Sequence, residues 1–322
     1  MSRLLEHLGV DRPIVQAGMG GGVARHELAA AVSEAGGLGT IGMLSPARLG
    51  EELLAARRLT DAPIAVNLLL PFATGASWQA AEAADVVVTY WGPPRRMTSR
   101  GWLHQCGSVD EAHAAHAAGA DGVIVQGVEA GGHVRGTVSA LELLERARST
   151  LPPELPVLLA GGIADGGDVQ TALDAGADAA VLGTRFLLSE ESRAHPEYKQ
   201  TAVAAEQTVL TELFGLGWPA APHRVLPNAA TRRWLAAGGR GPSWALAMQR
   251  TLSPFAGRLP ERLASRLAAA QRPKMPLLSP SPPVDDAPLG CLLEAGPLYA
   301  GQSVARIGDV RPAAALVAEL TP

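Results

Sequence analysis

A histidine set behind two glycines is the residue of this chain best placed to do chemistry. Gly131 and Gly132 precede His133, and all three follow the apolar, strand-like run Gly122–Gln126. Glycines remove side-chain bulk, so backbone and imidazole can both approach a flat ligand closely. An imidazole with its ordinary pKa near about 6.5 can accept a proton at neutral pH. The segment therefore predicts a ligand-binding loop with His133 as a candidate base, in preference to a histidine that only packs.

Two later loops carry glycines in a setting that suits an anion. Gly161 and Gly162 directly follow one apolar run, and Gly183 and Thr184 follow the next. If these runs are the seventh and eighth strands of an α/β barrel, their loops can offer backbone N–H groups to a phosphate. Either loop alone would be an ordinary tight turn. The pair together predicts a phosphate site.

A third glycine-rich loop, Gly18–Gly22, follows the first apolar run. It is close to the dinucleotide-binding pattern G-x-G-x-x-G, but Val23 stands where the last glycine belongs, so that fold is only weakly indicated. At a barrel mouth its backbone, including Met19, would instead lie against a ligand ring. Two strand-like runs end in amides that could hydrogen-bond the same ring or cap their own strand: Asn67 and Gln126.

Such loops can meet only if the strands before them end at a common edge. Short apolar runs alternate here with alanine-rich helical segments, which is the pattern of β/α units in a parallel sheet. Eight runs predict strands: Ile14–Ala17, Gly39–Ile41, Ile64–Asn67, Val86–Thr89, Leu103–Cys106, Gly122–Gln126, Val157–Ala160 and Ala180–Leu182. This regular alternation favours an α/β fold of the TIM (β/α)8 barrel type over a doubly wound sheet.

From His195 to about Arg272 the strand signal is absent and helical patterns replace it. They predict a cap beside the barrel mouth, with helices at Thr201–Leu213, Ala229–Ala237 and Pro260–Ala270. Prolines then mark an extended connector, which we expect to wrap or tether without chemistry of its own. A last helix, Pro312–Leu320, is expected to pack back on the barrel. The predicted division is a barrel of residues 1–194 and 295–322 that binds the cofactor, a helical substrate-side cap of residues 195–275 and a connector of residues 276–294.

Composition narrows the class of protein. Of the 322 residues, 47% are hydrophobic and 18% are charged, so the chain can bury a sizeable core. The formal net charge is -4 and no basic cluster accompanies aromatics, which gives a nucleic-acid partner no electrostatic support. The distant Cys106 and Cys291 indicate no disulfide framework, and neither a signal peptide nor a membrane-spanning run is recognisable. We expect a cytoplasmic protein that acts on a small molecule.

Several further residues could take part in chemistry. His104, Cys106, His113 and His116 include zinc-ligand types, but no second ligand pair has the usual spacing, so we expect structural roles and no metal site. The segment Tyr90–Gly92 could line a substrate pocket or pack under the cap. The same alternatives are open for four side chains of the cap: Trp218, His223, Trp234 and Trp244.

Taken together, five segments resemble the nitronate monooxygenase (2-nitropropane dioxygenase) family: Gln16–Met19, Val66–Asn67, Gln126–His133, Ala160–Ile163 and Leu182–Phe186. The likeness spans Pro13 to about Lys199, and Ala300–Gln302 in the tail adds to it. The resemblance implies a TIM barrel that holds FMN. It places the phosphate at Gly162, Gly183 and Thr184, the isoalloxazine near Gly18, Met19, Asn67, Gln126, Gly131 and Gly132, and further cofactor contacts at Gly161 and Gln302.

The same resemblance makes His133 the candidate base. We hypothesise that His133 removes the α-proton of a nitroalkane, or orients a nitronate, during FMN-dependent oxidation with dioxygen to a carbonyl compound and nitrite. Flavin-dependent enoyl-acyl-carrier-protein reductases are similar in the same motifs. An alternative is therefore an NAD(P)H-dependent flavin reductase acting on enoyl thioesters or quinones, and a third is flavin binding without turnover. The expected partners are a small substrate and dioxygen, and the expected assembly is a monomer or homodimer.

Overall fold

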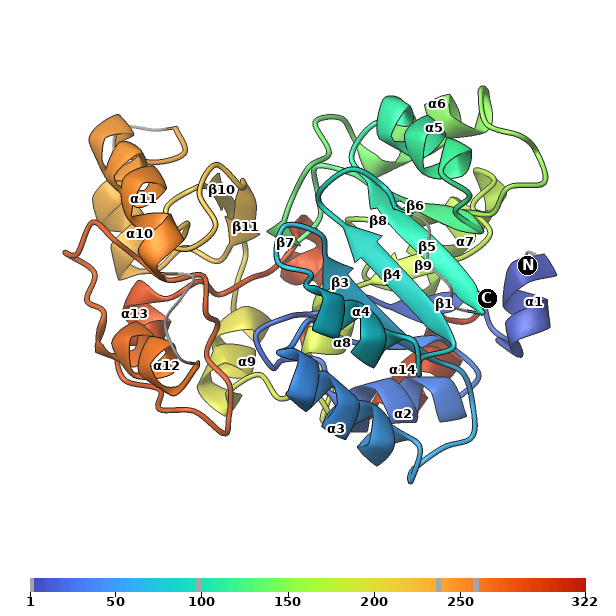
Figure 1. Ribbon diagram of the computed structural model, residues 1–322, viewed down its shortest axis with the longest axis horizontal. Helices are drawn as coiled ribbons and strands as arrows, with labels where there is room; N and C mark the ends of the chain where they lie inside the picture. Colours follow the sequence, from blue (N-terminus) through green and yellow to red (C-terminus); the bar gives the residue numbers. More distant parts are fainter. Residues whose placement is uncertain (1–2, 96–99, 236–238, 257–260) are drawn as a thin grey trace.

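Eight parallel strands form the centre of the molecule in a computed structural model that describes residues 3–95, 100–235, 239–256 and 261–322 (Figure 1). The strands are β1 (Ile14–Gln16), β2 (Gly39–Ile41), β3 (Ile64–Leu69), β4 (Val86–Tyr90), β5 (Gly101–Cys106), β6 (Gly122–Gln126), β8 (Val157–Ala160) and β9 (Ala180–Leu182). They are hydrogen-bonded in the order β1-β9-β8-β6-β5-β4-β3-β2. The bridge between Val15 and Leu38 joins β1 to the start of β2 and closes the ring. The predicted TIM barrel and its eight strands are confirmed.

The strands are apolar along their whole length because both of their faces are covered, as in other parallel sheets. In β6, Ile124 belongs to the cluster inside the barrel, whereas Val123 and Val125 pack outward against helices. Helix α1 (Arg3–Leu8) adds Leu5 to the inner cluster, where this side chain is fully buried. The interior is thus a packed core that leaves the opposite, carboxyl-terminal end free for a site.

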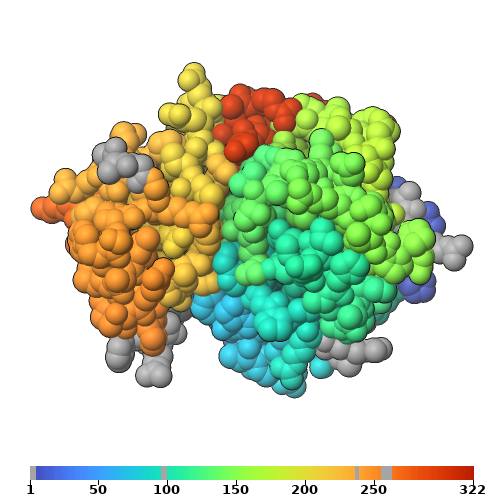
Figure 2. All heavy atoms as spheres, turned by 90° about the horizontal axis from the view of Figure 1, so that it is seen from above, coloured from blue at the N-terminus to red at the C-terminus, as the bar shows by residue number. Residues whose placement is uncertain are grey.

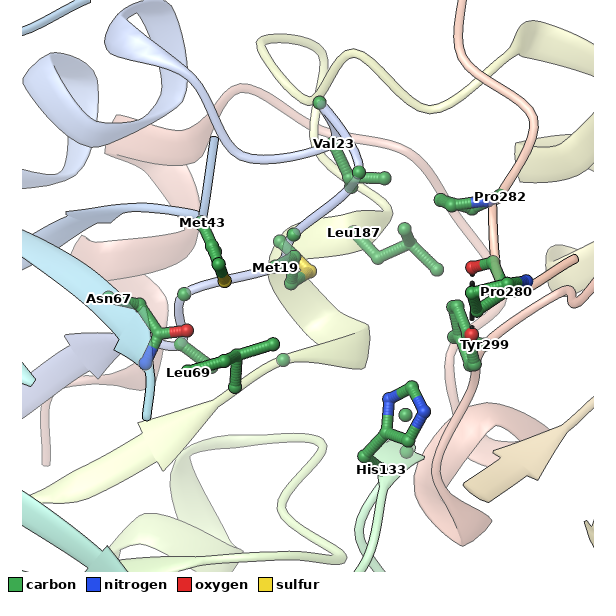
Figure 3. Close-up of a pocket in the computed structure, with 18 of the residues that line it drawn as sticks. Met19, Val23, Met43, Asn67, Leu69, His133, Leu187, Pro280, Pro282 and Tyr299 are labelled. Atoms are coloured by element: carbon green, nitrogen blue, oxygen red, sulfur yellow. Dashed lines mark hydrogen bonds between the residues drawn. The ribbon is translucent and has the colours of Figure 1, made fainter. Parts of the chain in front are cut away.

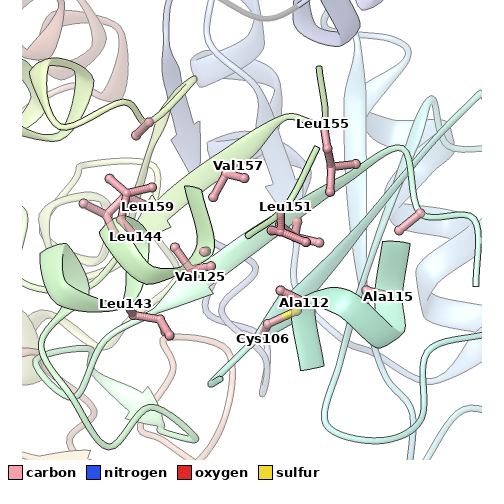
Figure 4. Close-up of a cluster of buried hydrophobic side chains, with 14 of the residues drawn as sticks. Cys106, Ala112, Ala115, Val125, Leu143, Leu144, Leu151, Leu155, Val157 and Leu159 are labelled. Carbon is pink, nitrogen blue, oxygen red and sulfur yellow. The ribbon is translucent and has the colours of Figure 1, made fainter. Parts of the chain in front are cut away.

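The outer ring consists of helices, most of which bury one apolar stripe. They are α2 (His26–Glu34), α3 (Pro46–Ala56), α4 (Gly75–Ala81), α5 (Val109–Ala117), α6 (Ala140–Arg148), α7 (Gly166–Asp174), α8 (Thr184–Leu187) and α14 (Ala313–Leu320). Helix α6 shows why such a segment forms. Ser139 caps its first turn by accepting from the Glu142 N–H at 3.3 Å, and Leu143 and Leu144 are buried against β6 and β8 (Figure 4). Helix α14 lies against α2 and α7.

The cap follows α8 and contains helices and strands. Its elements, with those of the tail, are α9 (Pro196–Val203), β10 (Val209–Thr211), β11 (His223–Val225), α10 (Ala229–Trp234), α11 (Ser243–Ala256), α12 (Glu261–Ala270), α13 (Leu292–Ala295) and the 3-10 helix η1 (Gln302–Arg306). Figure 2 shows the yellow and orange atoms of the cap directly against the barrel. Among the described residues, none of the helices combines the length and apolarity needed to cross a bilayer.

The predicted helix over Thr201–Leu213 is wrong beyond Val203, as is the expectation that the cap has no strands. Val209–Thr211 pairs antiparallel with His223–Val225, and that strand pairs in turn with β7 (Gly132–His133). The stability of β10 therefore depends on partners that lie far away in sequence. The other two predicted cap helices are close to α10 and α12, although residues 236, 237 and 260 lie outside the described part of the chain.

Candidate active site

A cavity of about 1110 Å³ opens at the carboxyl ends of the barrel strands and extends under the cap (Figure 3). Eleven of the predicted site residues line it: Gly18, Met19, Asn67, Gln126, Gly131, Gly132, His133, Gly161, Gly162, Gly183 and Thr184. Gln302 is not among the residues that line the cavity, and its side chain is exposed. The loops predicted to share one edge of the barrel therefore do meet there.

The tail of the chain fixes the two loops predicted to hold a phosphate. Gly162 has a φ of 78°, a left-handed conformation that suits glycine. Its carbonyl accepts a hydrogen bond from the Arg306 guanidinium at 2.9 Å, and the hydroxyl of Thr184 accepts from the N–H of Gly301 at 2.9 Å. Arg306 also pairs with Asp168 at 2.7 Å. Both loops are thus held by the segment around η1, which the resemblance at Ala300–Gln302 had indicated, although it gave no sign of the contacts made by Arg306.

Gly131 is required where the histidine loop meets the tail. A Cβ atom at Gly131 would lie 2.4 Å from the backbone nitrogen of Gly301, a distance that no side chain tolerates. In the same region the N–H of Gln302 donates to the carbonyl of Glu129 at 2.9 Å. The glycine therefore allows two backbones to pack directly together as well as leaving space on the cavity side.

The amide of Gln126 holds the histidine loop. Its Nε2 donates to the carbonyl of His133 at 3.1 Å, and its Oε1 accepts from the hydroxyl of Tyr90 at 2.6 Å and from the N–H of Arg135 at 3.2 Å. The N–H of Arg135 also donates to the Tyr90 hydroxyl at 3.2 Å. Burial raises the pKa of Tyr90, so its hydroxyl stays a neutral donor. Tyr90 and Gln126 thus position His133 from the ends of β4 and β6.

The imidazole of His133 lies against Trp218 in the cavity wall, with ring centroids 3.8 Å apart and planes 24° apart. Its Nε2 is buried and has no hydrogen-bond partner among the described residues. Burial lowers the pKa of His133 well below its usual value, and the neighbouring His223 adds to this effect. At neutral pH the ring is therefore uncharged, and none of the described residues holds its Nε2 in one tautomer by a hydrogen bond.

His223 is the second histidine of this region and has a structural role. Its Nδ1 lies 2.8 Å from the carbonyl of Ala221, and its Nε2 accepts from the N–H of Phe214 at 3.3 Å. Both nitrogens are therefore occupied in a neutral ring. Burial lowers the pKa of His223 to about 4. His133 is the member of the pair that can serve a ligand.

Two aromatic residues from the far part of the chain complete the wall. Trp218 is 8% exposed, and Tyr299 donates its hydroxyl to the carbonyl of Pro280 at 2.9 Å. Tyr299 faces His133 with ring centroids 5.6 Å apart (Figure 3). The connector, expected to wrap or tether without chemistry of its own, lines the cavity with Pro280 and Pro282. Sequence reasoning left Trp218 undecided and did not find Tyr299.

The other aromatic residues that the sequence left undecided differ in whether they line the cavity. Tyr90 lines the cavity, and Trp91 packs edge-on against Trp218 at 5.1 Å between ring centroids. Trp234 and Trp244 contact each other, with ring centroids 5.8 Å apart, and neither lines the cavity. Asn67 lines the opposite side, where its Nδ2 donates to the carbonyl of Val88 at 3.2 Å. Its Oδ1 is left to contact a ligand.

The residues considered as zinc ligands have other partners. Nδ1 of His104 lies 2.7 Å from the hydroxyl of Thr89, and burial lowers the pKa of His104 to about 4. Cys106 is buried in the core, while the exposed His113 has Nε2 at 3.1 Å from Thr150. Within the described ranges a different group has metal-ligand geometry: His26, Glu27 and Glu52. Arginines already pair with both of its carboxylates, Arg193 with Glu27 and Arg25 with Glu52.

One family model matches nearly the whole chain, and several known proteins are similar to it. The family model described as nitronate monooxygenase matches residues 1–92 and 96–322. The solved structure of FabK from Thermotoga maritima has a TM-score of 0.76 at 30% identity and covers 99% of this chain and 94% of that one. Nitroalkane oxidase from Streptomyces ansochromogenes gives 0.72 at 30% identity, covering 98% and 96%. A (3aS,4S,5R,7aS)-5-hydroxy-7a-methyl-1-oxo-octahydro-1H-indene-4-carboxyl-CoA dehydrogenase of Mycobacterium tuberculosis is 32% identical over 76% of this chain and 71% of its own.

Proposed function

Because the chain belongs to the nitronate monooxygenase family, whose members are flavin-dependent oxidoreductases, we propose that it binds FMN and oxidises alkyl nitronates with dioxygen. The products are a carbonyl compound and nitrite. Nitroalkanes are substrates as well if His133 removes their α-proton and so converts them to nitronates. The observation that carries this proposal is the uncharged imidazole of His133, with its Nε2 unpartnered among the described residues, in the wall of a cavity that the glycine loops of the barrel also line.

The residues present suit FMN. The cavity of about 1110 Å³ exceeds the range of roughly 300 to 1,000 Å³ usual for one small ligand, so it has room for a cofactor and a substrate. The loops at Gly162 and Gly183 would hold the phosphate, and the backbone around Gly18 and Gly131, with the amide of Asn67, would lie against the ring. Bound flavin supplies the redox chemistry, taking electrons from the substrate and passing them to dioxygen.

The contribution of the protein centres on His133. With the proton on Nδ1, the Nε2 of the neutral ring can accept the α-proton of a nitroalkane. In the other tautomer, Nε2–H can donate to an oxygen of a nitronate and orient it. Tyr90 and Gln126 fix the backbone that carries this ring, while Trp218 and Tyr299 exclude water from its surroundings. Position and polarity thus come from the chain itself.

The test begins with an absorption spectrum of the purified protein and identification of the released flavin. FMN is expected, and anaerobic addition of propionate 3-nitronate should bleach the bound flavin. His133→Asn should retain the flavin and lose roughly 10²- to 10⁴-fold in kcat/KM for a nitroalkane, the usual contribution of a general base. A protein that cannot take up FMN would overturn the proposal. So would a flavin that NADPH bleaches and a nitronate does not.

That last outcome would favour the alternative, an NAD(P)H-dependent flavin reductase acting on enoyl thioesters or quinones. The observation in its favour is the similarity to a relative whose name specifies a CoA thioester as substrate. His133 would then donate a proton or orient the thioester. Turnover of NADPH with crotonyl thioester or with quinone, measured beside turnover of propionate 3-nitronate, separates the two functions. We also propose that the protein acts in the cytoplasm and that it is a monomer or homodimer. Gel filtration would test the oligomeric state.

A further inference from the structure

The side chain in closest ring contact with His133 comes from the cap. Trp218 follows the turn at Gly215–Gly217, between the strands β10 and β11. Its indole lies at 3.8 Å from the imidazole, whereas the next rings, His223, Tyr299 and Trp91, lie between 5.2 and 6.0 Å away at steeper angles. Since backbone contacts hold the loop but not the ring, the orientation of the imidazole depends on Trp218.

Trp218 is itself held on its other sides. Phe72, which follows β3, meets it edge-on at 5.2 Å, and Trp91, which follows β4, does so at 5.1 Å. Trp91 has a φ of 64°, a left-handed conformation that is unusual for a bulky residue and persists only where packing enforces it. The guanidinium of Arg135 lies over its ring at 5.0 Å and is paired with Glu111. The barrel loops that carry Phe72 and Trp91 therefore pack against the indole of Trp218 and hold it in place.

We propose that Trp218 is a positioning residue for His133: its indole lies flat on the imidazole and fixes the orientation of that ring in the cavity wall. The proposal rests on the function proposed above, in which His133 handles a substrate proton. A reactive group displaced by about 1 Å can cost on the order of 100-fold in rate, so the orientation of one ring has a large effect. The cap thereby completes the catalytic geometry of the barrel.

The stacked indole also keeps water from the imidazole, in line with the lowered pKa of His133. The other titratable or charged groups around this ring and its loop are His223, Tyr299, Tyr90 and the pair formed by Arg135 and Glu111. None of these is altered by a substitution at Trp218. A change in the titration of His133 after such a substitution therefore reports on the indole.

The experiment compares Trp218→Phe, Trp218→Leu and the control Trp244→Leu in the FMN-loaded enzyme. Phe keeps a flat ring, Leu keeps only apolar volume, and Trp244 is exposed on α11 outside the cavity. Trp218→Leu is expected to lower kcat about 10- to 100-fold while KM changes less than about 3-fold, because misorientation affects the transition state. Trp218→Phe should keep kcat within about 3-fold of wild type, and Trp244→Leu should match wild type.

The second readout is the titration of His133 by NMR of protein labelled in histidine, with its signal assigned by its loss in His133→Asn. In Trp218→Leu the pKa should rise toward its ordinary value, and in Trp218→Phe it should stay low. This measurement needs no turnover, so it remains readable if nitronates prove not to be substrates. Unchanged titration in the Leu variant, or a raised KM with unchanged kcat, would overturn the proposal. Should the Leu variant not fold, Trp218→Met, whose unbranched side chain has about the same volume and adapts more readily to the space left by the indole, replaces it.

Discussion

At the scale of residues, the site contains pairs of similar side chains. In each pair one side chain has all its hydrogen-bond partners, and the other keeps a nitrogen or an oxygen without one. His133 and His223 lie 5.2 Å apart between ring centroids, yet both nitrogens of His223 have partners and Nε2 of His133 has none. Likewise, the Gln126 amide is committed to the histidine loop, while Asn67 retains an acceptor. The chemistry of each side chain therefore depends on which hydrogen bonds its neighbours already make.

Tyr90→Phe tests the support of the histidine loop. The change removes a hydroxyl that donates to Gln126 at 2.6 Å and accepts from the N–H of Arg135 at 3.2 Å, with the carbonyl of His133 at 3.2 Å. Losing these buried bonds should cost about 1 to 3 kcal/mol of unfolding free energy. We expect kcat to fall and flavin to remain bound, measured by thermal unfolding, steady-state kinetics and flavin absorbance. Unaltered kcat in a destabilised protein would show that the loop does not need this hydroxyl.

At the scale of elements, the barrel could be predicted and much of its site could not. Each barrel strand is an apolar run whose own residues are enough to predict a strand. Gly131, Gly162 and His133 belong to short motifs that follow such strands. Strand β10 is stable only through β11, and Trp218 and Tyr299 reach His133 from distant parts of the chain. Such contacts depend on tertiary pairing, which local patterns do not contain.

Gly131→Ala tests the packing of the histidine loop against the tail. A methyl group 2.4 Å from the nitrogen of Gly301 would force two backbones apart, so we expect lower stability and weaker flavin binding. The matched control is Gly50→Ala in α3, where a Cβ meets nothing within 4 Å. That change should stabilise the protein by up to about 1 kcal/mol through helix propensity. Flavin titration and thermal unfolding of both variants measure the effects, and equal flavin affinity in the two would refute the expectation.

At the scale of the whole molecule, buried neutral histidines set the response to acid. Burial lowers the pKa of His104 and of His223 to about 4, and that of His133 also lies below its usual value. As the pH falls below about 6.5, the unfolded chain takes up protons that the folded protein does not. Stability is therefore lost between about pH 6.5 and pH 4, by on the order of 3 kcal/mol for each of His104 and His223.

Denaturant unfolding across this range should show the loss, and His104→Gln should make its pH dependence less steep. The exposed His113 serves as the control, and His113→Gln should leave the dependence as it is. Identical slopes for wild type and His104→Gln would contradict the assignment.

The position of α14 affects how the chain can be made. Its residues, Ala313–Leu320, pack between α2 and α7 and share one apolar cluster with Ile14 of the first strand. During synthesis on a ribosome, the early strands emerge long before this helix, and the wall beside β1 stays uncovered until residue 320 has left the exit tunnel. The barrel therefore cannot be complete before α14 has emerged, and until then the apolar surface that this helix covers is open to aggregation.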